Sequence, residues 1–251
     1  MPSDAFLITV VLYGGTMKDF IKNFTLGEKI LWLISTLGIT AAFLIFDRGN
    51  FLTLIASVFG VTAILLNAKG NPLGQMLMIF FSVMYGIISY KFAYYGEMIT
   101  YLGMTGPMAV LALVSWLRHP FENNKSEVEV NHIKKGELNF MWLLAAAVTV
   151  MFYFILRHFN TANLIFSTIS VTTSFVAVYL TFRRSELFSL GYAANDVVLI
   201  VLWSLASLQS REYICMVICF IAFLANDTYA YFSWLNIKKR QMSITASVTE
   251  K

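Results

Sequence analysis

Long apolar runs separated by short polar connections follow one another along almost the whole chain. A helix needs about 20 mostly apolar residues to cross the hydrocarbon core of a bilayer, and eight runs approach or reach that length. Backbone groups find no water inside a bilayer, so each run is predicted to be a helix that satisfies its own hydrogen bonds. The predicted spans are Glu28–Phe46, Phe51–Asn67, Gly74–Tyr94, Met98–Leu117, Leu138–Arg157, Thr161–Phe182, Leu187–Leu208 and Tyr213–Leu235.

The connections between the runs are short, with one exception. The 20-residue segment Arg118–Glu137 carries four basic and four acidic residues and is predicted to be the main linker outside the bilayer. The first apolar stretch, Ala5–Gly15, is only 11 residues long. It has neither the basic region nor the small-residue cleavage site of a signal peptide, so we interpret it as an interfacial lead-in.

The lysines and arginines divide unequally between the two ends of the predicted spans. Of 18 such residues, 14 lie on the side of the long linker and the C-terminus, and only Arg48, Lys91, Arg157 and Arg211 lie on the other side. Cytoplasmic loops carry the excess of positive charge in membrane proteins. Both termini are therefore predicted to be cytoplasmic, in a multi-pass protein of the cell inner (plasma) membrane.

Composition supports the membrane class and argues against others. Hydrophobic residues make up 58% of the chain and charged residues 13%, about half the charged share of an average soluble domain. The net charge of +4 comes from the basic loops and does not indicate nucleic-acid binding. The chain shows no phosphate-binding loop or metal-ligand spacing, and Cys215 and Cys219 fit small core residues. We expect no cofactor, no metal and no nucleic-acid partner.

Two stretches, 51–117 and 161–237, are predicted to be copies of one three-helix unit. In each copy a basic turn follows the first helix, an acid lies in the connection after the second, and the third ends at a tryptophan. Agreement at several positions argues for a repeat. The matching pairs are Lys69 with Arg183-Arg184, Glu97 with Glu212, and Trp116 with Trp234.

The segment between the copies, 118–160, contains one further helix that returns the chain to the starting side. Both copies then run in the same direction, in a plan of three helices, a linker helix and three helices (3+1+3), with a solute path between the two units. Residues 1–50 add a lead-in and an extra helix, and 238–251 form a basic tail. The predicted fold class is an all-α membrane protein with about eight transmembrane helices.

Two aspartates lie deep within predicted spans, where a charged group costs about 3 kcal/mol. Asp196 and Asp227 each follow an asparagine, Asn195 and Asn226. Both pairs lie roughly 12–14 Å from the cytoplasmic surface, at 1.5 Å per helical residue. They are predicted to form a polar floor for a solute with hydroxyl or amide groups. Helix–helix contacts and proton coupling are the alternative roles.

Aromatic and hydroxyl side chains on the same helices are candidates to complete a binding site. A cationic ring stacked on an aromatic face gains about 1–2 kcal/mol when it is desolvated. Trp116, Trp142 and Trp234, near span ends, are instead expected to be interface anchors. The candidates are Tyr192, Phe188, Trp203 and Tyr229 in the second copy, and Ser82, Tyr85, Tyr101 and Thr105 in the first.

Pro107 follows Gly103 and Gly106 in the third core helix. Proline removes a backbone hydrogen bond and kinks helices, so this helix is predicted to be kinked or loosened there, and its pliability is a hypothesis for how one unit moves against the other.

The chain resembles the PnuC vitamin transporters over about residues 51–240, within the SWEET-like 3+1+3 architecture. The resemblance rests on Glu186 and Asn195, and on the segment from Phe220-Ile221-Ala222 through Asn226-Asp227 to Trp234 and its basic tail. The SWEET-type Pro-Gln signature is missing, and Phe188 and Gly191 stand where PnuC proteins often have tryptophan. The run Glu28–Phe46 would then be an extra helix outside the core.

This resemblance implies uptake of nicotinamide riboside by facilitated diffusion, with trapping by phosphorylation in the cytoplasm. The partners are then a cationic aromatic vitamin and the lipid bilayer, and the protein is not an enzyme. A thiamine transporter of the same family is the alternative. An intramembrane enzyme or a sensor is a weaker one, because the Asn-Asp pairs match no catalytic signature and no effector domain is evident. The sequence leaves the oligomeric state open, a homo-oligomer included.

Overall fold

The computed structural model describes residues 24–92, 94–122 and 124–249, and the predicted lead-in at Ala5–Gly15 lies outside them. Eight helical segments of the described chain are long and apolar enough to cross a membrane, which confirms the predicted number. The helices are α3 (Leu26–Phe46), α4 (Phe51–Ala68), α5 (Leu73–Lys91), α6 (Tyr95–Thr100), α7 (Gly106–Arg118), α8 (Lys135–His158), α9 (Leu164–Phe182), α10 (Phe188–Ser207) and α11 (Ile214–Thr249).

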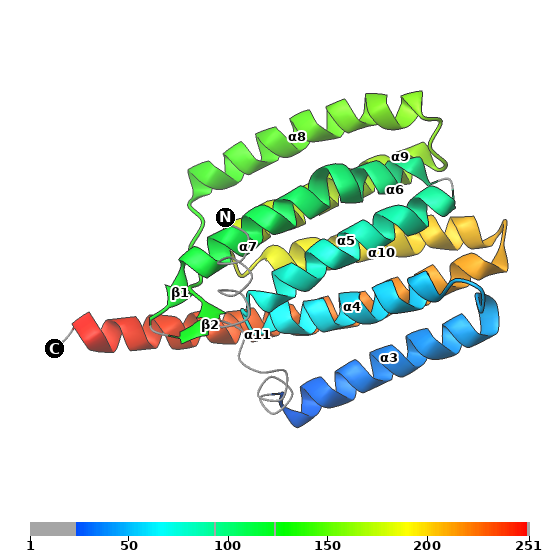
Figure 1. Ribbon diagram of the computed structural model, residues 1–251. Helices are drawn as coiled ribbons and strands as arrows, with labels where there is room; N and C mark the ends of the chain where they lie inside the picture. The colour runs from blue at the N-terminus through cyan, green and yellow to red at the C-terminus, as the bar shows by residue number, and fades with distance from the viewer. Residues whose placement is uncertain (1–23, 93, 123, 250–251) are drawn as a thin grey trace, which may run out of the picture.

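The helices of the core contact one another in a closed ring, and Figure 1 shows them running roughly parallel. In ring order these are α4, α5, α6–α7, α9, α10 and α11, and α11 closes the ring by packing on α4. Helix α8 lies outside the ring against α9, and α3 lies outside it against α11 and α4. The main cluster of buried apolar side chains lies among these helices. That the ring consists of two parallel repeats stays a prediction.

The fourth predicted span, Met98–Leu117, is not a continuous α-helix. Between α6 and α7 the segment η1 (Tyr101–Thr105) is a π-helix, one turn ahead of Pro107. Proline cannot donate a backbone hydrogen bond and its ring crowds the carbonyl four residues earlier. The loosening expected from the sequence is therefore present, and it widens the turn that carries Tyr101.

Trp116 and Trp234 hold the ring together at the end where the hairpin and the C-terminus lie. The Trp116 indole N–H donates to the Thr181 carbonyl of α9 (2.9 Å), and the Trp234 indole N–H donates to the Asn67 carbonyl of α4 (2.6 Å). Both side chains are fully buried, so their expected role as interface anchors is wrong. Trp142 of α8 is more than half exposed, as an anchor would be.

The serines before these tryptophans repeat the pattern. Ser115 donates to the Phe182 carbonyl (3.0 Å), and Ser233 donates to the Ala68 carbonyl (2.7 Å). Each Ser-Trp dipeptide thus bonds the last carbonyls of one helix, which have no partner within that helix. We call the two sets the Ser-Trp latches.

The long linker contains a small β-hairpin that the sequence analysis missed. Strands β1 (Pro120–Phe121) and β2 (Asn124–Val128) pair antiparallel. The Val128 amide donates to the Gly70 carbonyl and the Asn131 amide to the Arg184 carbonyl, so the linker lies across two interhelical turns. Neither strand has an alternating apolar pattern, and the segment is held both by these backbone bonds and by the Val128 side chain, which is buried in an apolar cluster.

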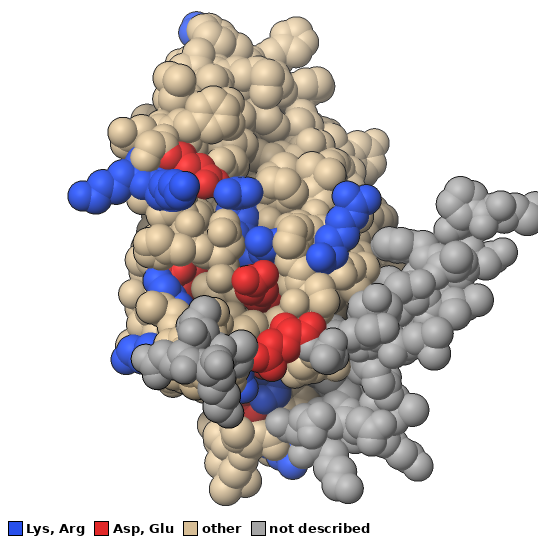
Figure 2. Space-filling view, turned by 90° about the vertical axis from the view of Figure 1, so that its left-hand side faces the viewer, with Lys and Arg blue, Asp and Glu red and all other residues tan. Residues whose placement is uncertain are grey.

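Helix α11 continues past the predicted end of its span and includes most of the predicted basic tail. Gln241 accepts from the Val130 amide (2.9 Å) and donates to Glu127, and Arg240 pairs with Glu127. Lys238 pairs with Glu186 at the start of α10. Figure 2 shows this end of the molecule, with basic and acidic side chains close together on it.

Candidate functional site

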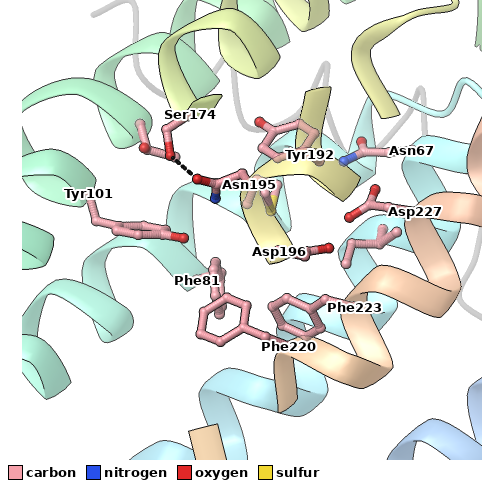
Figure 3. Close-up of a pocket in the computed structure, with 13 residues that line it drawn as sticks. Asn67, Phe81, Tyr101, Ser174, Tyr192, Asn195, Asp196, Phe220, Phe223 and Asp227 are labelled. Carbon is pink, nitrogen blue, oxygen red and sulfur yellow. Dashed lines mark hydrogen bonds between the residues drawn. The ribbon is translucent and has the colours of Figure 1, made fainter. Parts of the chain in front are cut away.

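A small cavity lies inside the ring, between α4, α5, η1, α9, α10 and α11 (Figure 3). Its volume is about 20 Å³, enough for about one water molecule. It is lined by Ile64, Asn67, Met78, Phe81, Tyr101, Thr105, Ser174, Tyr192, Asn195, Asp196, Phe220, Phe223 and Asp227.

Two carboxylates form one side of the cavity. Asp196 of α10 and Asp227 of α11 are each only 3% exposed, and their side chains point toward each other in Figure 3. The Asp196 Oδ2 atom is buried and has no hydrogen-bond donor among the described protein atoms. The described residues that line the cavity include no lysine or arginine. Two facing, buried carboxyl groups can both be ionised only beside a partner of the opposite charge, so this wall is suited to a cation.

Asn195 lies beside the carboxylates with a fixed orientation. Its Oδ1 atom accepts from the hydroxyls of Thr173 (2.8 Å) and Ser174 (3.0 Å) on α9. The α9 hydroxyls thus fix the orientation of the Asn195 amide. With Oδ1 committed, the amide N–H groups of Asn195 are the part that remains for a ligand acceptor.

Aromatic rings form the other side of the cavity. Phe81 of α5 lies 5.4 Å from Phe223 of α11 and 6.0 Å from Tyr101 of η1, between ring centroids. The Tyr101 hydroxyl points inward in Figure 3. The Phe223 ring occupies space left by Gly60, because a Cβ there would lie 2.2 Å from the ring. The π-helix and this glycine therefore place two of the rings.

Asn67, at the end of α4, was not predicted from the sequence. Its side-chain Oδ1 accepts from Gln75 (2.9 Å), and its carbonyl accepts from Trp234. Its place at the boundary of an apolar run gave no reason to assign it to an interior site. Phe81, Phe220 and Phe223 were also missed, because 22 phenylalanines provide no contrast along the chain.

The structure brings some of the predicted site residues together and places others elsewhere. Tyr101, Thr105, Tyr192, Asn195, Asp196 and Asp227 all line the cavity. Asn226 and Tyr229 instead contact α3, where they bond Ser35 and Glu28. The Ser82 hydroxyl donates to the Ile79 carbonyl of its own helix.

The other predicted aromatics lie on two sides of the cavity, one group toward the hairpin and the other away from it. Toward the hairpin, Phe188 packs edge-on against Trp234, with centroids 4.8 Å apart. At the opposite side, Trp203 donates to the Tyr85 hydroxyl (2.8 Å) and stacks against Tyr94 (4.7 Å). Burial raises the pKa of Tyr94 to about 12, so this outer hydroxyl stays neutral. Aromatic side chains thus pack on both sides of the cavity.

The closed cavity is far smaller than a ligand site. Pockets that hold small molecules usually enclose about 300–1,000 Å³, against about 20 Å³ here. Admission of a solute therefore requires the rings to move apart.

Comparison with known proteins places the chain among transporters. The model of the nicotinamide mononucleotide transporter family matches residues 50–236, well over half of the chain. The nicotinamide riboside transporter PnuC of Neisseria mucosa is 27% identical over 218 residues, which cover 84% of this chain and 82% of the relative. The chain belongs to the PnuC family.

A solved PnuC protein has the same fold. The crystal structure of the vitamin B3 transporter PnuC superposes with a TM-score of 0.78 at 20% identity, covering 90% of this chain and all of that chain. The family resemblance drawn from the sequence is confirmed, and so is the assignment as a multi-pass membrane transporter and not an enzyme. The matched residues 50–236 reach from the start of α4 into α11 and leave α3 outside.

Proposed function

We propose that this protein takes up nicotinamide riboside across the cell inner membrane by facilitated diffusion, and that phosphorylation in the cytoplasm traps the nucleoside. Asn195, Asp196, Asp227, Tyr192, Tyr101 and Thr105 are proposed to contact it, together with Asn67, Phe81, Phe220 and Phe223. The observation that carries the proposal is the pair of facing, buried aspartates in a cavity without a basic residue among the described lining residues.

Nicotinamide riboside matches the two walls of the cavity. Its pyridinium ring is flat and positively charged, so it would gain about 1–2 kcal/mol over a desolvated aromatic face and would offset the two carboxylates. Its ribose hydroxyls can donate to carboxylate oxygens, and its carboxamide oxygen can accept from the Asn195 amide. The relative from Neisseria mucosa is named for the same nucleoside.

The same walls disfavour the phosphorylated form of the nucleoside. A phosphate carries about −1.5 to −2 charges near pH 7, and the cavity presents two carboxylates to it. Phosphate recognition normally uses arginine, lysine or a helix N-terminus. Selection of the riboside over the mononucleotide follows, although the family model is named for the mononucleotide.

We further propose that the ring consists of two parallel three-helix units, 51–117 and 161–237, joined by 118–160, with both termini in the cytoplasm. The Ser-Trp latches support the units, since the third helix of each binds the first helix of the other in the same way. The excess of basic residues toward the hairpin supports the orientation.

Uptake into proteoliposomes tests the proposal. With no ion gradient and no membrane potential, labelled nicotinamide riboside should enter until its internal and external concentrations are equal, and Asp196→Asn/Asp227→Asn should abolish entry above empty liposomes. Thiamine and a neutral sugar are parallel substrates. Uptake of thiamine alone would retain the transporter and change the vitamin. Dependence on an imposed pH gradient would replace facilitated diffusion by proton coupling.

A further inference from the structure

Helix α3 forms polar contacts with the back of α11, the helix that carries Asp227. The Asn226 side-chain amide donates to the Ser35 hydroxyl of α3 (2.8 Å). Three residues further along α11, the Tyr229 hydroxyl donates to Glu28 (2.8 Å). Residues three apart share one face of a helix, so α3 binds α11 along a single stripe.

These contacts are buried, although α3 itself lies at the outside of the ring. Ser35 is 6% exposed, Glu28 is 2% exposed and Asn226 is fully buried. The Asn226 amide also donates to the Ala222 carbonyl one turn earlier (2.7 Å). Both of its N–H groups are therefore used, one within α11 and one to α3. A partner lost from such a site leaves a buried polar group unsatisfied.

The contact lies directly behind the cavity. Asn226 and Asp227 are consecutive, and consecutive helical residues point about 100° apart at 3.6 residues per turn. The first therefore faces α3 while the second faces the cavity, as its place in Figure 3 shows. Rotation of α11 about its axis would move both side chains together. The bond to α3 resists that rotation at the residue next to the carboxylate.

We infer that Ser35 of α3 is a positioning residue for the substrate site: through Asn226 it fixes the rotation of α11 and so the place of the Asp227 carboxylate. The helix that does this lies ahead of the region that the family model matches, residues 50–236. Asn226 and Tyr229 then act behind the site and do not contact the solute. The inference rests on the proposed function for its substrate, nicotinamide riboside.

A double-mutant cycle tests the inference on the full-length protein in detergent. Calorimetry gives the Kd for nicotinamide riboside with the wild type, Ser35→Ala, Asp227→Asn and the double variant. Ser35→Ala should weaken binding by about threefold to tenfold, the range of one hydrogen bond. In the Asp227→Asn background the same change should have less than a twofold effect, because the carboxylate it positions is gone.

Two further variants separate positioning from general destabilisation. Thr40→Ala removes a hydroxyl that bonds only the Thr36 carbonyl within α3 (2.7 Å), and it should leave Kd unchanged. Asn226→Ala should reproduce the loss seen with Ser35→Ala. Equal losses from Ser35→Ala in both Asp227 backgrounds, or no loss in either, would overturn the inference.

A ligand-independent measurement decides the matter if the wild type does not bind nicotinamide riboside, an outcome that would count against the proposed function alone. The thiol of Asp227→Cys is labelled with a small methanethiosulfonate reagent and followed by peptide mass. Adding Ser35→Ala should change the labelling rate at residue 227 by at least threefold, whereas Thr40→Ala should not. An unchanged rate with both would contradict the inference.

Discussion

The two halves of the ring differ at the cavity and agree at the hairpin end. Helices α9–α11 contribute Asn195, Asp196 and Asp227, whereas α4–α7 contribute Asn67, aromatic rings and hydroxyls but no carboxylate. At the hairpin end each half contributes one Ser-Trp latch with the same bonds. The two latches of the ring are therefore alike, whereas the acidic side chains of the cavity come from one half.

The largest expected effect comes from the acidic half. Asp227→Asn removes a buried charge that would pair with the pyridinium ring, and a hydrogen bond to a charged group contributes about 1.5–3 kcal/mol. The Kd for nicotinamide riboside should rise about tenfold to a hundredfold by calorimetry. Glu212→Gln, which changes an acid outside the cavity, is the matched control. Equal effects of the two changes would show that the acidic wall has no special role.

A smaller loss of affinity for nicotinamide riboside is expected from a change at the Asn195 amide. Asn195→Ala removes one neutral hydrogen-bonding group, worth about 0.5–1.5 kcal/mol, so affinity should fall about twofold to tenfold. Ser174→Ala removes one of the two hydroxyl donors to Asn195 and should have less effect, since Thr173 still holds the amide. A thermal-shift series on the same variants separates affinity from stability. A larger loss from Ser174→Ala than from Asn195→Ala would refute this arrangement.

The likeness of the two Ser-Trp latches predicts that equivalent substitutions in them have matched effects on stability. Trp116→Phe and Trp234→Phe each delete one indole N–H and leave a buried carbonyl with one bond fewer. Each should lower the free energy of unfolding by about 1 kcal/mol, with similar shifts of Tm in detergent. A loss confined to one of the two would show that the latches are not equivalent, and Trp142→Phe on the exposed face of α8 is the control.

The smallest effect is expected at the opposite end of the molecule, in the connection between α3 and α4. Burial, and then the Glu212 carboxylate, raise the pKa of Asp47 above its ordinary value of 3.8. The folded protein then binds this proton more tightly than the unfolded chain, so stability falls as pH rises from 3.8 through the raised pKa. Asp47→Asn should raise Tm slightly at neutral pH and not near pH 3.8. A lower Tm at neutral pH would contradict this.

The spans could be predicted because long apolar runs are a strong signal in a membrane protein. Carboxylates within such runs are an equally strong signal of a site. Asp196, Asp227 and Asn195 were found on that basis, and all three line the cavity. Asn226 was grouped with its neighbour because proximity in sequence does not reveal direction around a helix. The contact with α3 that turns it away joins residues 191 positions apart, and no local pattern encodes such a contact.

The hairpin was not predicted, and the role predicted for the two tryptophans was wrong, for another reason. Strand β2 is mostly polar, and the backbone bonds that hold the linker at two turns leave no signature in the sequence. Trp116 and Trp234 resemble interface anchors in sequence, since each stands at the end of an apolar run before basic residues. Only the packing of two distant helices shows that each is buried.

Calorimetric titration of the purified wild-type protein with nicotinamide riboside and with nicotinamide mononucleotide, under identical conditions, tests the central claim most directly. Two facing aspartates in a cavity without a basic lining residue in the described chain predict micromolar or tighter binding of the riboside. They also predict at least tenfold weaker binding of the mononucleotide. Equal or tighter binding of the mononucleotide would contradict the account.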